Sequence, residues 1–396
     1  MSDVKKLRSA LQVVLDRAVE EGNVAGMNAL IRQGGKDIAY VQSGYADIEN
    51  KKEFKRDTIM RVYSMSKPIT SAAVMILVER GLIGMGEPVS KYLPGFKDQV
   101  ILTEDGAKPV ARPAYIRDLM CMTSGLPYGN LEGSPAEKEA QKVFDEIDKR
   151  LYTDDPMGTV EIANRLGQAG LSFQPGKLWQ YGTSADILGA VVEVVSGMSF
   201  GEFLRKEIFE PLGMEDTGFW VPADKQARVA EVYERREGVL EHFKTNHLGI
   251  KYTLDKEPAF QSGGAGLTST IDDYAKFAQM LQNGGEYNGH RILNKRTVEY
   301  MAHGALTPSQ REYLWSTWDS LCGYDYGCLM RHAVNPEMAY FYTWQDEYGW
   351  DGWLGTFFAN VPGKTDATIL LGMQISNLDG NFISEKVRNT VAQYLA

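Results

Sequence analysis

Cysteine and histidine are scarce in this chain, which limits the kinds of site it can build. The 396 residues include three cysteines (Cys121, Cys322 and Cys328) and five histidines. Three thiols cannot form a disulfide framework in a chain of this length, so we expect them to be reduced, small buried hydrophobes. The sequence contains no C-x-x-C and no H-x-x-x-H pair. It therefore predicts no metal site.

Positive charge and long apolar runs are lacking as well. With 42 Lys and Arg against 52 Asp and Glu, the net charge is −10, which argues against a nucleic-acid partner because phosphate binding needs a clustered basic surface. No apolar run approaches the ~18 residues of a membrane span, and the first residues lack the apolar core of a signal peptide. We expect a soluble, cytoplasmic protein with no membrane partner, and leave open whether it forms a homo-oligomer.

Strands and helices are expected at both ends of the chain, around a mostly helical middle. Paired apolar segments flanking short turns predict β-hairpins at 26–44 and 353–375. Because hairpins from the two ends can join into one sheet, the order of elements favours an α/β (α+β) fold, with an antiparallel sheet flanked by helices and an inserted, mostly helical domain. Helical periodicity marks residues 7–18, 70–81, 185–197, 271–285 and 384–396.

The expected division into domains follows from this order. We expect residues 1–86, 178–240 and 316–396 to form the α/β domain. Residues 87–177 and 241–315 are expected to form the helical domain, with the active site between the two.

The segment Ser64-Met65-Ser66-Lys67 is the most informative one for function. If Ser64 begins a helix, its hydroxyl and the Lys67 amine lie one turn apart on the same face. A serine needs a neighbouring base to become a nucleophile, and a desolvated lysine can be that base. The pattern S-x-x-K also occurs at 2–5, and Ser64 could simply cap a helix, so the tetrad must be judged by its surroundings.

Those surroundings resemble the serine β-lactamase and penicillin-recognising superfamily. Residues 57–96 are similar to its nucleophile region, and the likeness covers nearly the whole chain through residues 119–129, 173–197, 263–285 and 348–356. More narrowly, the chain looks like the family VIII carboxylesterases and the class C β-lactamases. The resemblance implies a β-lactamase-like fold with no cofactor and no metal. It also implies Ser64 as the acylated nucleophile and Lys67 as its base partner.

Two tyrosines compete for the third catalytic role. The resemblance matches Tyr181 to the tyrosine that shares proton transfer with the lysine. Tyr128-Gly129-Asn130 satisfies the Y-x-N pattern of class C enzymes literally, but it follows TSGLP, which in these families is a turn ahead of the catalytic tyrosine. We therefore favour Tyr181 and place Tyr128 among the substrate-binding residues. Either tyrosine could instead be a buried aromatic with a satisfied hydroxyl.

Trp350-Asp351-Gly352 stands where lactamases carry K-T-G and family VIII esterases often carry W-G-G. The resemblance implies that these three residues contact substrate. It also implies that the backbone N–H groups of Ser64 and Trp353 form the oxyanion hole. The literal pair Lys364-Thr365 lies in a predicted hairpin turn, and we expect no catalytic role for it.

The missing lysine indicates the substrate class. In K-T-G the lysine holds the carboxylate that β-lactams and D-Ala-D-Ala peptides present, a charge-assisted contact that Trp350 cannot make. The asparagine expected two residues after the tyrosine is Thr183 here, so the substrate-binding position loses its amide. Both changes favour esters over β-lactams, unless a cation such as Arg331 compensates.

Two further patterns have simpler explanations. Gly197-Met198-Ser199-Phe200-Gly201 matches the G-x-S-x-G nucleophile elbow of α/β-hydrolases, but it follows a helical run and not a strand. We interpret Ser199, with Glu202, as a helix cap. Aromatic residues crowd the segment 313–353, and some could line a pocket for a hydrophobic acyl or aryl group, although packing explains most of them.

The sequence as a whole predicts a serine carboxylesterase. It would cleave a small-molecule ester through an acyl-enzyme on Ser64, with Lys67 and Tyr181 as the proton-transfer pair. A β-lactamase, a D-aminopeptidase or amidase, and an acyltransferase are alternatives with the same fold. A non-catalytic, penicillin-binding-like protein is a further alternative, which the presence of Ser64, Lys67 and Tyr181 together disfavours.

Overall fold

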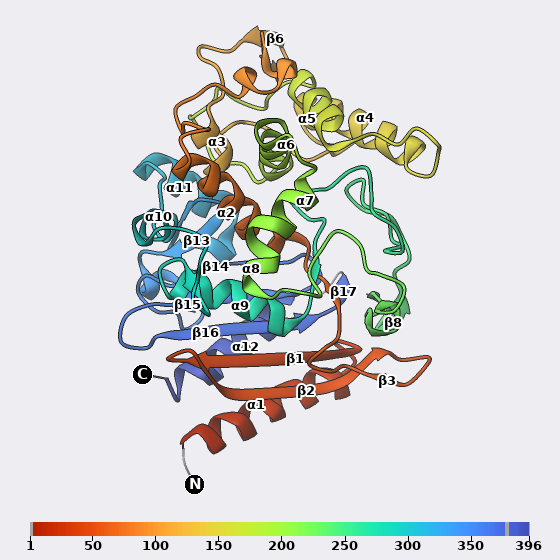
Figure 1. The fold of residues 1–396 in the computed structure, drawn as a ribbon, viewed down its shortest axis with the longest axis vertical. Coiled ribbons are helices and arrows are strands. Elements are labelled where there is room, and N and C mark those ends of the chain that lie inside the picture. Colours follow the sequence, from red (N-terminus) through yellow and green to blue (C-terminus); the bar gives the residue numbers. More distant parts are fainter. Residues whose placement is uncertain (1–2, 377–379, 396) are drawn as a thin grey trace.

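An eight-stranded antiparallel sheet built from both ends of the chain forms the centre of the molecule (Figure 1). The computed structural model describes residues 3–376 and 380–395. The two predicted hairpins meet where β1 pairs with β16, which confirms both hairpins and their union in one sheet. In sheet order the strands are β12 (Tyr324–Gly327), β13 (Met330–Ala333), β14 (Tyr348–Asp351), β15 (Phe357–Val361), β16 (Ala367–Met373), β1 (Gly26–Gln33), β2 (Lys36–Asp47) and β3 (Lys52–Glu53).

Side chains of the central strands alternate between two buried faces. Ala29 and Ile31 of β1 belong to one apolar core, whereas Leu30 between them belongs to the other. The same alternation separates Phe357 from Phe358 in β15. Because both faces are covered, these strands are largely apolar, and removing that surface from water is the main driving force for folding.

Helices from opposite ends of the chain cover one face of the sheet. α1 (Asp3–Glu20) packs on β2 and on α12 (Gly380–Ala392), and Figure 1 shows α1 below β2 and α12 at the level between β16 and β1. Leu7, Leu11 and Leu15 form the buried stripe of α1. Both terminal helices are confirmed, although α12 begins and ends four residues earlier than the predicted 384–396.

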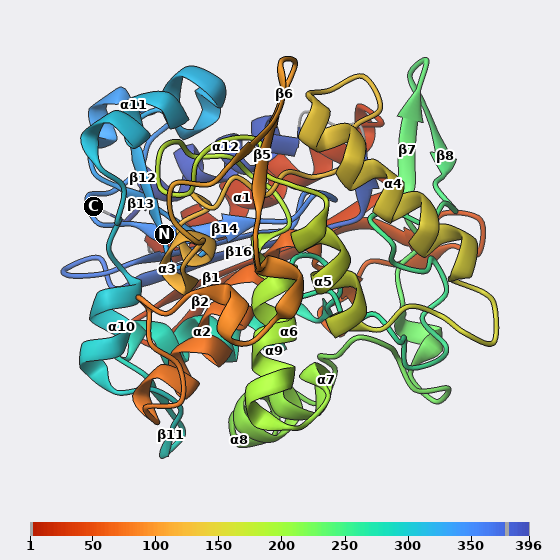
Figure 2. The same ribbon diagram turned by 90° about the horizontal axis from the view of Figure 1, so that it is seen from above.

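The other face carries a thicker helical layer, seen from above in Figure 2. α9 (Ile271–Gln282) packs directly on β1, β15 and β16. α2 (Ser66–Glu79) and α6 (Ser184–Ser196) pack against each other. They are the helices that the sequence predicts at 70–81 and 185–197. Further helices are α3 (Ile116–Met120), α4 (Pro135–Arg150), α5 (Thr159–Gln168), α7 (Phe200–Leu204), α8 (Glu210–Leu212), α10 (Lys295–Met301) and α11 (Pro308–Thr317).

Short strands join the loops of this layer. They are β4 (Met60–Arg61) with β9 (Thr268–Ser269), β5 (Val100–Thr103) with β6 (Gly106–Pro109), β10 (Glu286–Tyr287) with β11 (His290–Arg291), and β7 (Tyr233–Arg236) between β8 (Val239–His242) and β17 (Ile375–Ser376). The β4–β9 pair is the most relevant to the site, because β4 directly precedes the segment that carries Ser64.

Two helices make contacts across the expected division into domains, which stays a prediction. α9 falls in the range 241–315, assigned to the helical domain, and it packs on the sheet. α6 falls in the range 178–240, assigned to the α/β domain, and it packs on α2 of that domain and on α3 and α5 of the helical domain. The reason is physical: periodicity shows that a helix has an apolar face, but it does not show which neighbour covers that face.

In the part of the chain that the structure describes, no single helix combines the length and apolarity of a membrane span. α6 and the segment Phe200–Leu212 reach that threshold only as a pair, and they are bent by 80° relative to each other.

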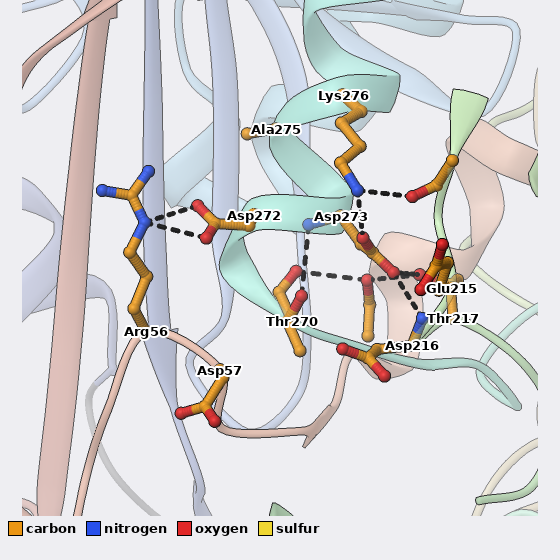
Figure 3. A network of polar contacts seen from close by, with 12 residues as sticks. Arg56, Asp57, Glu215, Asp216, Thr217, Thr270, Asp272, Asp273, Ala275 and Lys276 are labelled. Carbon is orange, nitrogen blue, oxygen red and sulfur yellow. Dashed lines mark hydrogen bonds and ion pairs between the residues drawn. The ribbon is translucent and has the colours of Figure 1, made fainter.

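A buried carboxylate organises the start of α9 (Figure 3). The Thr270 hydroxyl caps the helix by accepting from the Asp273 N–H at 3.2 Å. The Asp273 carboxylate in turn accepts from the Asp216 N–H at 2.7 Å, from the Thr217 hydroxyl at 3.1 Å and from the Lys276 amine at 2.8 Å. This network ties the loop after α8 to the helix that supports the sheet.

We expect Asp273→Ala to lower the free energy of unfolding by about 2–3 kcal/mol, because it leaves buried donors without an acceptor. The matched control is the neighbouring Asp272→Ala, which removes a half-exposed ion pair with Arg56 and should cost about 1 kcal/mol or less. Urea denaturation of the two variants measures both values. Equal losses would contradict the role given to Asp273.

Candidate active site

Ser64 lies in a single 3-10 turn, Tyr63–Met65, that runs directly into α2. This turn is strained, because Tyr63 has a φ of 43°, a region that costs a bulky residue about 1–3 kcal/mol. Packing holds it in place: the Tyr63 ring lies 5.1 Å from the Trp353 ring and 5.7 Å from His247, between centroids. The predicted position of Ser64 at a helix start is confirmed.

Lys67 is fully buried, and its amine makes three hydrogen bonds. The amine donates to the Ser64 hydroxyl at 3.1 Å, to the Tyr128 hydroxyl at 3.1 Å and to the Gly264 carbonyl at 2.9 Å. The buried amine thus has three hydrogen-bond acceptors around it, as many as a lysine amine can use. The predicted Ser64–Lys67 pair on one helix face is therefore present.

Both candidate tyrosines reach Lys67, but in different ways. Tyr128 contacts the amine through its hydroxyl, and burial raises the pKa of Tyr128 well above its ordinary value of about 10. Tyr181 offers its ring face to the amine, with the nitrogen 4.5 Å from the ring centroid. The Tyr181 hydroxyl oxygen accepts a hydrogen bond from the Trp350 indole N–H at 3.0 Å, which leaves its own proton available for donation.

A cavity of about 280 Å³ opens in front of Ser64. Tyr181, Trp350, Asp351, Gly352 and Trp353 line it together with Ser64, as the sequence predicts for a substrate site. The aromatic segment 313–353 supplies further apolar wall in Trp318, Leu321 and Phe341.

Two predicted substrate-binding residues do not line this cavity. Thr183 is fully buried, and its hydroxyl donates to the Pro127 carbonyl at 3.4 Å. It precedes α6 as the N-cap residue. The Tyr128 hydroxyl points to Lys67, so Tyr128 contacts the catalytic amine and not the open space.

The turn after β14 is held against the nucleophile segment. The Gly352 N–H donates to the Thr356 carbonyl at 2.7 Å, and the Thr356 hydroxyl donates to the Val62 carbonyl at 3.2 Å. A Cβ on Gly352 would lie 2.0 Å from the Thr356 hydroxyl and 2.4 Å from the Val62 carbonyl oxygen, so only glycine fits. This contact brings Trp353 and Ser64 to one cavity; the role of their N–H groups as oxyanion donors stays a prediction.

Arg331, which could have replaced the missing lysine, is already paired. It is 2% exposed and donates to the Asp351 carboxylate at 2.7 Å. Asp351 is the more exposed partner, at 43%. The pair leaves this wall of the cavity without a free cation from Arg331.

Sequence reasoning missed the acceptor of the third Lys67 hydrogen bond. Gly264 lies in a turn that also contains Gly263, and the Asp186 carboxylate contacts this turn. The local signal was the run GGAG at 263–266. Such a run indicates that the backbone lies close to another segment, but it does not identify that segment.

The competing motifs fall where local structure explains them. Ser199 caps α7 by accepting from the Glu202 N–H at 3.2 Å and follows a helix, as interpreted. Lys364 and Thr365 lie in the turn between β15 and β16. Cys121 and Cys328 are buried, and Cys322 is half-buried. Among residues 3–376 and 380–395, no three His, Cys, Asp or Glu side chains gather as metal ligands would.

Comparison with known proteins agrees with the geometry. The β-lactamase family model matches residues 11–389. Esterase EstB of Burkholderia gladioli is 32% identical over 290 residues, which cover 71% of this chain and 71% of EstB. The ML-236A carboxylate methylbutanoyltransferase mlcH of Penicillium citrinum is 26% identical over 336 residues, which cover 81% of this chain and 76% of mlcH.

Solved structures share the fold. EstCE1, a hydrolase with promiscuous acyltransferase activity, superposes with a TM-score of 0.82 at 24% identity, over 98% of this chain and 99% of EstCE1. The β-lactamase-like fold expected from the sequence is thus confirmed, and the extent of the family match decides the classification. The chain belongs to the β-lactamase family of serine hydrolases and related acyltransferases.

Proposed function

We propose that this protein is a serine carboxylesterase that works through an acyl-enzyme on Ser64. The observation that carries the proposal is the Ser64 hydroxyl, 3.1 Å from the buried Lys67 amine and open to an apolar-walled cavity. Ser64 attacks the ester carbonyl, the alcohol leaves, and water then releases the acid. The similarity to Esterase EstB over 71% of the chain supports the same substrate class.

Proton transfer is assigned to Lys67 and Tyr181. Attack by Ser64 requires Lys67 in its neutral form, so that the amine can accept the serine proton. Tyr181 lines the cavity and keeps a proton to give to the leaving alcohol, because its oxygen already accepts from Trp350. Tyr128 has the opposite character: its buried hydroxyl, with a raised pKa, stays neutral and orients the amine.

Esters are favoured over β-lactams by the charge of the cavity wall. The lactam carboxylate needs a cation, and Trp350 supplies an indole instead. Arg331 is bound to Asp351, so a substrate carboxylate would have to compete with Asp351 for this buried guanidinium.

Acyl transfer to an alcohol is the second candidate activity. The apolar wall of Trp318, Leu321 and Phe341 could hold an organic alcohol in place of water, and a bound alcohol would then take the acyl group from Ser64. The similarity to the methylbutanoyltransferase mlcH supports this candidate.

The first test uses p-nitrophenyl butyrate. We expect Ser64→Ala to abolish hydrolysis, and Lys67→Ala to lower kcat by about 10²- to 10⁴-fold with the fold intact by circular dichroism, because the general base is lost. Ser199→Ala is the control and should keep wild-type rates. Hydrolysis that survives Ser64→Ala would place the nucleophile elsewhere.

Adding a primary alcohol and measuring the new ester separates hydrolysis from acyl transfer.

The second test ranks the tyrosines. We expect Tyr181→Phe to lower kcat by about 10²-fold or more, since it removes the proton donor to the leaving group. Tyr128→Phe keeps the ring and removes one acceptor of Lys67, so its loss should be smaller, about tenfold. Steady-state kinetics of both variants decide the assignment. The reverse order would make Tyr128 the proton carrier.

The third test concerns substrate class. Trp350→Lys should raise the ratio of cephalosporin hydrolysis to ester hydrolysis, because it restores a cation for the lactam carboxylate. Trp350→Phe is the control, since it also removes the hydrogen bond to Tyr181 but adds no charge. The ratio should rise in the lysine variant alone. If both variants give the wild-type ratio, the charge of this wall does not select esters.

A further inference from the structure

We propose that Asp186 is the residue that positions the Lys67 amine for catalysis, acting through the turn Ser262–Ala265. This inference rests on the proposed function, because it concerns the base of the same reaction. Asp186 does not line the cavity and does not touch Ser64 or the substrate space. It is therefore a positioning residue and not a catalytic one.

The contacts of Asp186 form a short chain that ends at the Lys67 amine. One carboxylate oxygen accepts from the Ser262 hydroxyl at 2.5 Å and from the Gly264 N–H at 3.0 Å. The Ser262 hydroxyl also accepts from the Ala265 N–H at 3.0 Å, which closes the turn. The carbonyl of the same Gly264 receives the Lys67 amine at 2.9 Å. Asp186 thus fixes the peptide that takes the third hydrogen of the amine.

The fit around this turn leaves little freedom. A Cβ on Gly264 would lie 2.8 Å from the other Asp186 oxygen, and a Cβ on Gly263 would lie 2.4 Å from the Ala185 carbonyl oxygen. The turn therefore sits directly on the first turn of α6, with no room for a side chain between them. Since Tyr181 and Asp186 both stand at the start of α6, the same helix end places the tyrosine and the turn.

The electrostatic surroundings of Asp186 also support a positioning role. Burial raises the pKa of Asp186, and the Ser262 hydroxyl, the Lys67 charge and the Gly264 N–H oppose that rise. A carboxylate in the first turn of a helix is ordinary, because the helix dipole favours it. The dipole does not explain why two donors of a distant turn converge on a side chain that is 5% exposed.

The decisive variant is Asp186→Asn, which keeps the shape and removes the charge. We expect kcat to fall about 10- to 100-fold through misplacement of the amine, with KM nearly unchanged because the cavity wall is intact. Asp273→Asn is the matched control, a buried carboxylate at the start of α9 that contacts neither Lys67 nor the cavity, and it should change stability without lowering kcat.

A second variant separates the turn from the charge. Ser262→Ala keeps the Asp186 carboxylate and removes one anchor of the turn, so kcat should fall severalfold with KM nearly unchanged. If Asp186→Asn fails to fold, an unchanged kcat in Ser262→Ala overturns the proposal. A kcat of Asp186→Asn equal to that of Asp273→Asn also overturns it, as does a loss confined to KM.

Phosphonylation of Ser64 by a fluorophosphonate keeps this test apart from the proposed function. The reaction reports activation of the serine whatever ester is natural, and the modified residue is identified by mass spectrometry. A wild type that labels but hydrolyses no ester would refute the esterase activity and still allow Asp186 to be tested by the labelling rate of its variants. A wild type that does not label would refute both. Labelling of Asp186→Asn at the wild-type rate would refute the role of Asp186 alone.

Discussion

The buried amine of Lys67 is the group on which the rest of the site depends. A polar nitrogen with no exposure to water is costly to bury unless its hydrogens find acceptors. Its acceptors come from three separate parts of the chain: Ser64 one turn earlier, Tyr128 after α3 and Gly264 before β9. These three parts of the chain must therefore be positioned accurately relative to one another if the amine is to have all its hydrogen bonds.

That requirement explains why the surroundings tolerate strain and close contact. The strain of the left-handed φ of Tyr63 is offset by the packing of its ring on Trp353, a residue that also lines the cavity. Gly352 lets the end of β14 approach Val62, immediately before the strained residue. The contact between the end of β14 and the turn that carries Ser64 therefore shapes both the position of Ser64 and the wall of the cavity.

The sequence was sufficient where function depends on local spacing. Ser64 and Lys67 are three residues apart, so helix geometry alone predicts their contact, and the hairpins at the chain ends predict the β1–β16 pairing. Long-range contacts were not accessible in the same way. Nothing in the sequence indicates that Arg331 pairs with Asp351, or that the Gly264 carbonyl receives Lys67, because each pair joins segments whose approach only the fold decides. α9 shows the same limit for packing: its apolar face was predictable, but the surface covering it was not.

The two tyrosines show how one amine can assign different roles to the same type of side chain. Tyr128 meets Lys67 with its hydroxyl in buried surroundings, where ionisation is unfavourable and the phenol is a fixed acceptor. Tyr181 meets it with its ring, which frees the hydroxyl to face the cavity and to accept from Trp350. Trp350 therefore links two parts of the site, since the indole that lines the cavity also donates to the phenol. In the proposed mechanism a change of substrate class and a change in proton transfer are coupled at that one position, because the same side chain forms the cavity wall and the hydrogen bond.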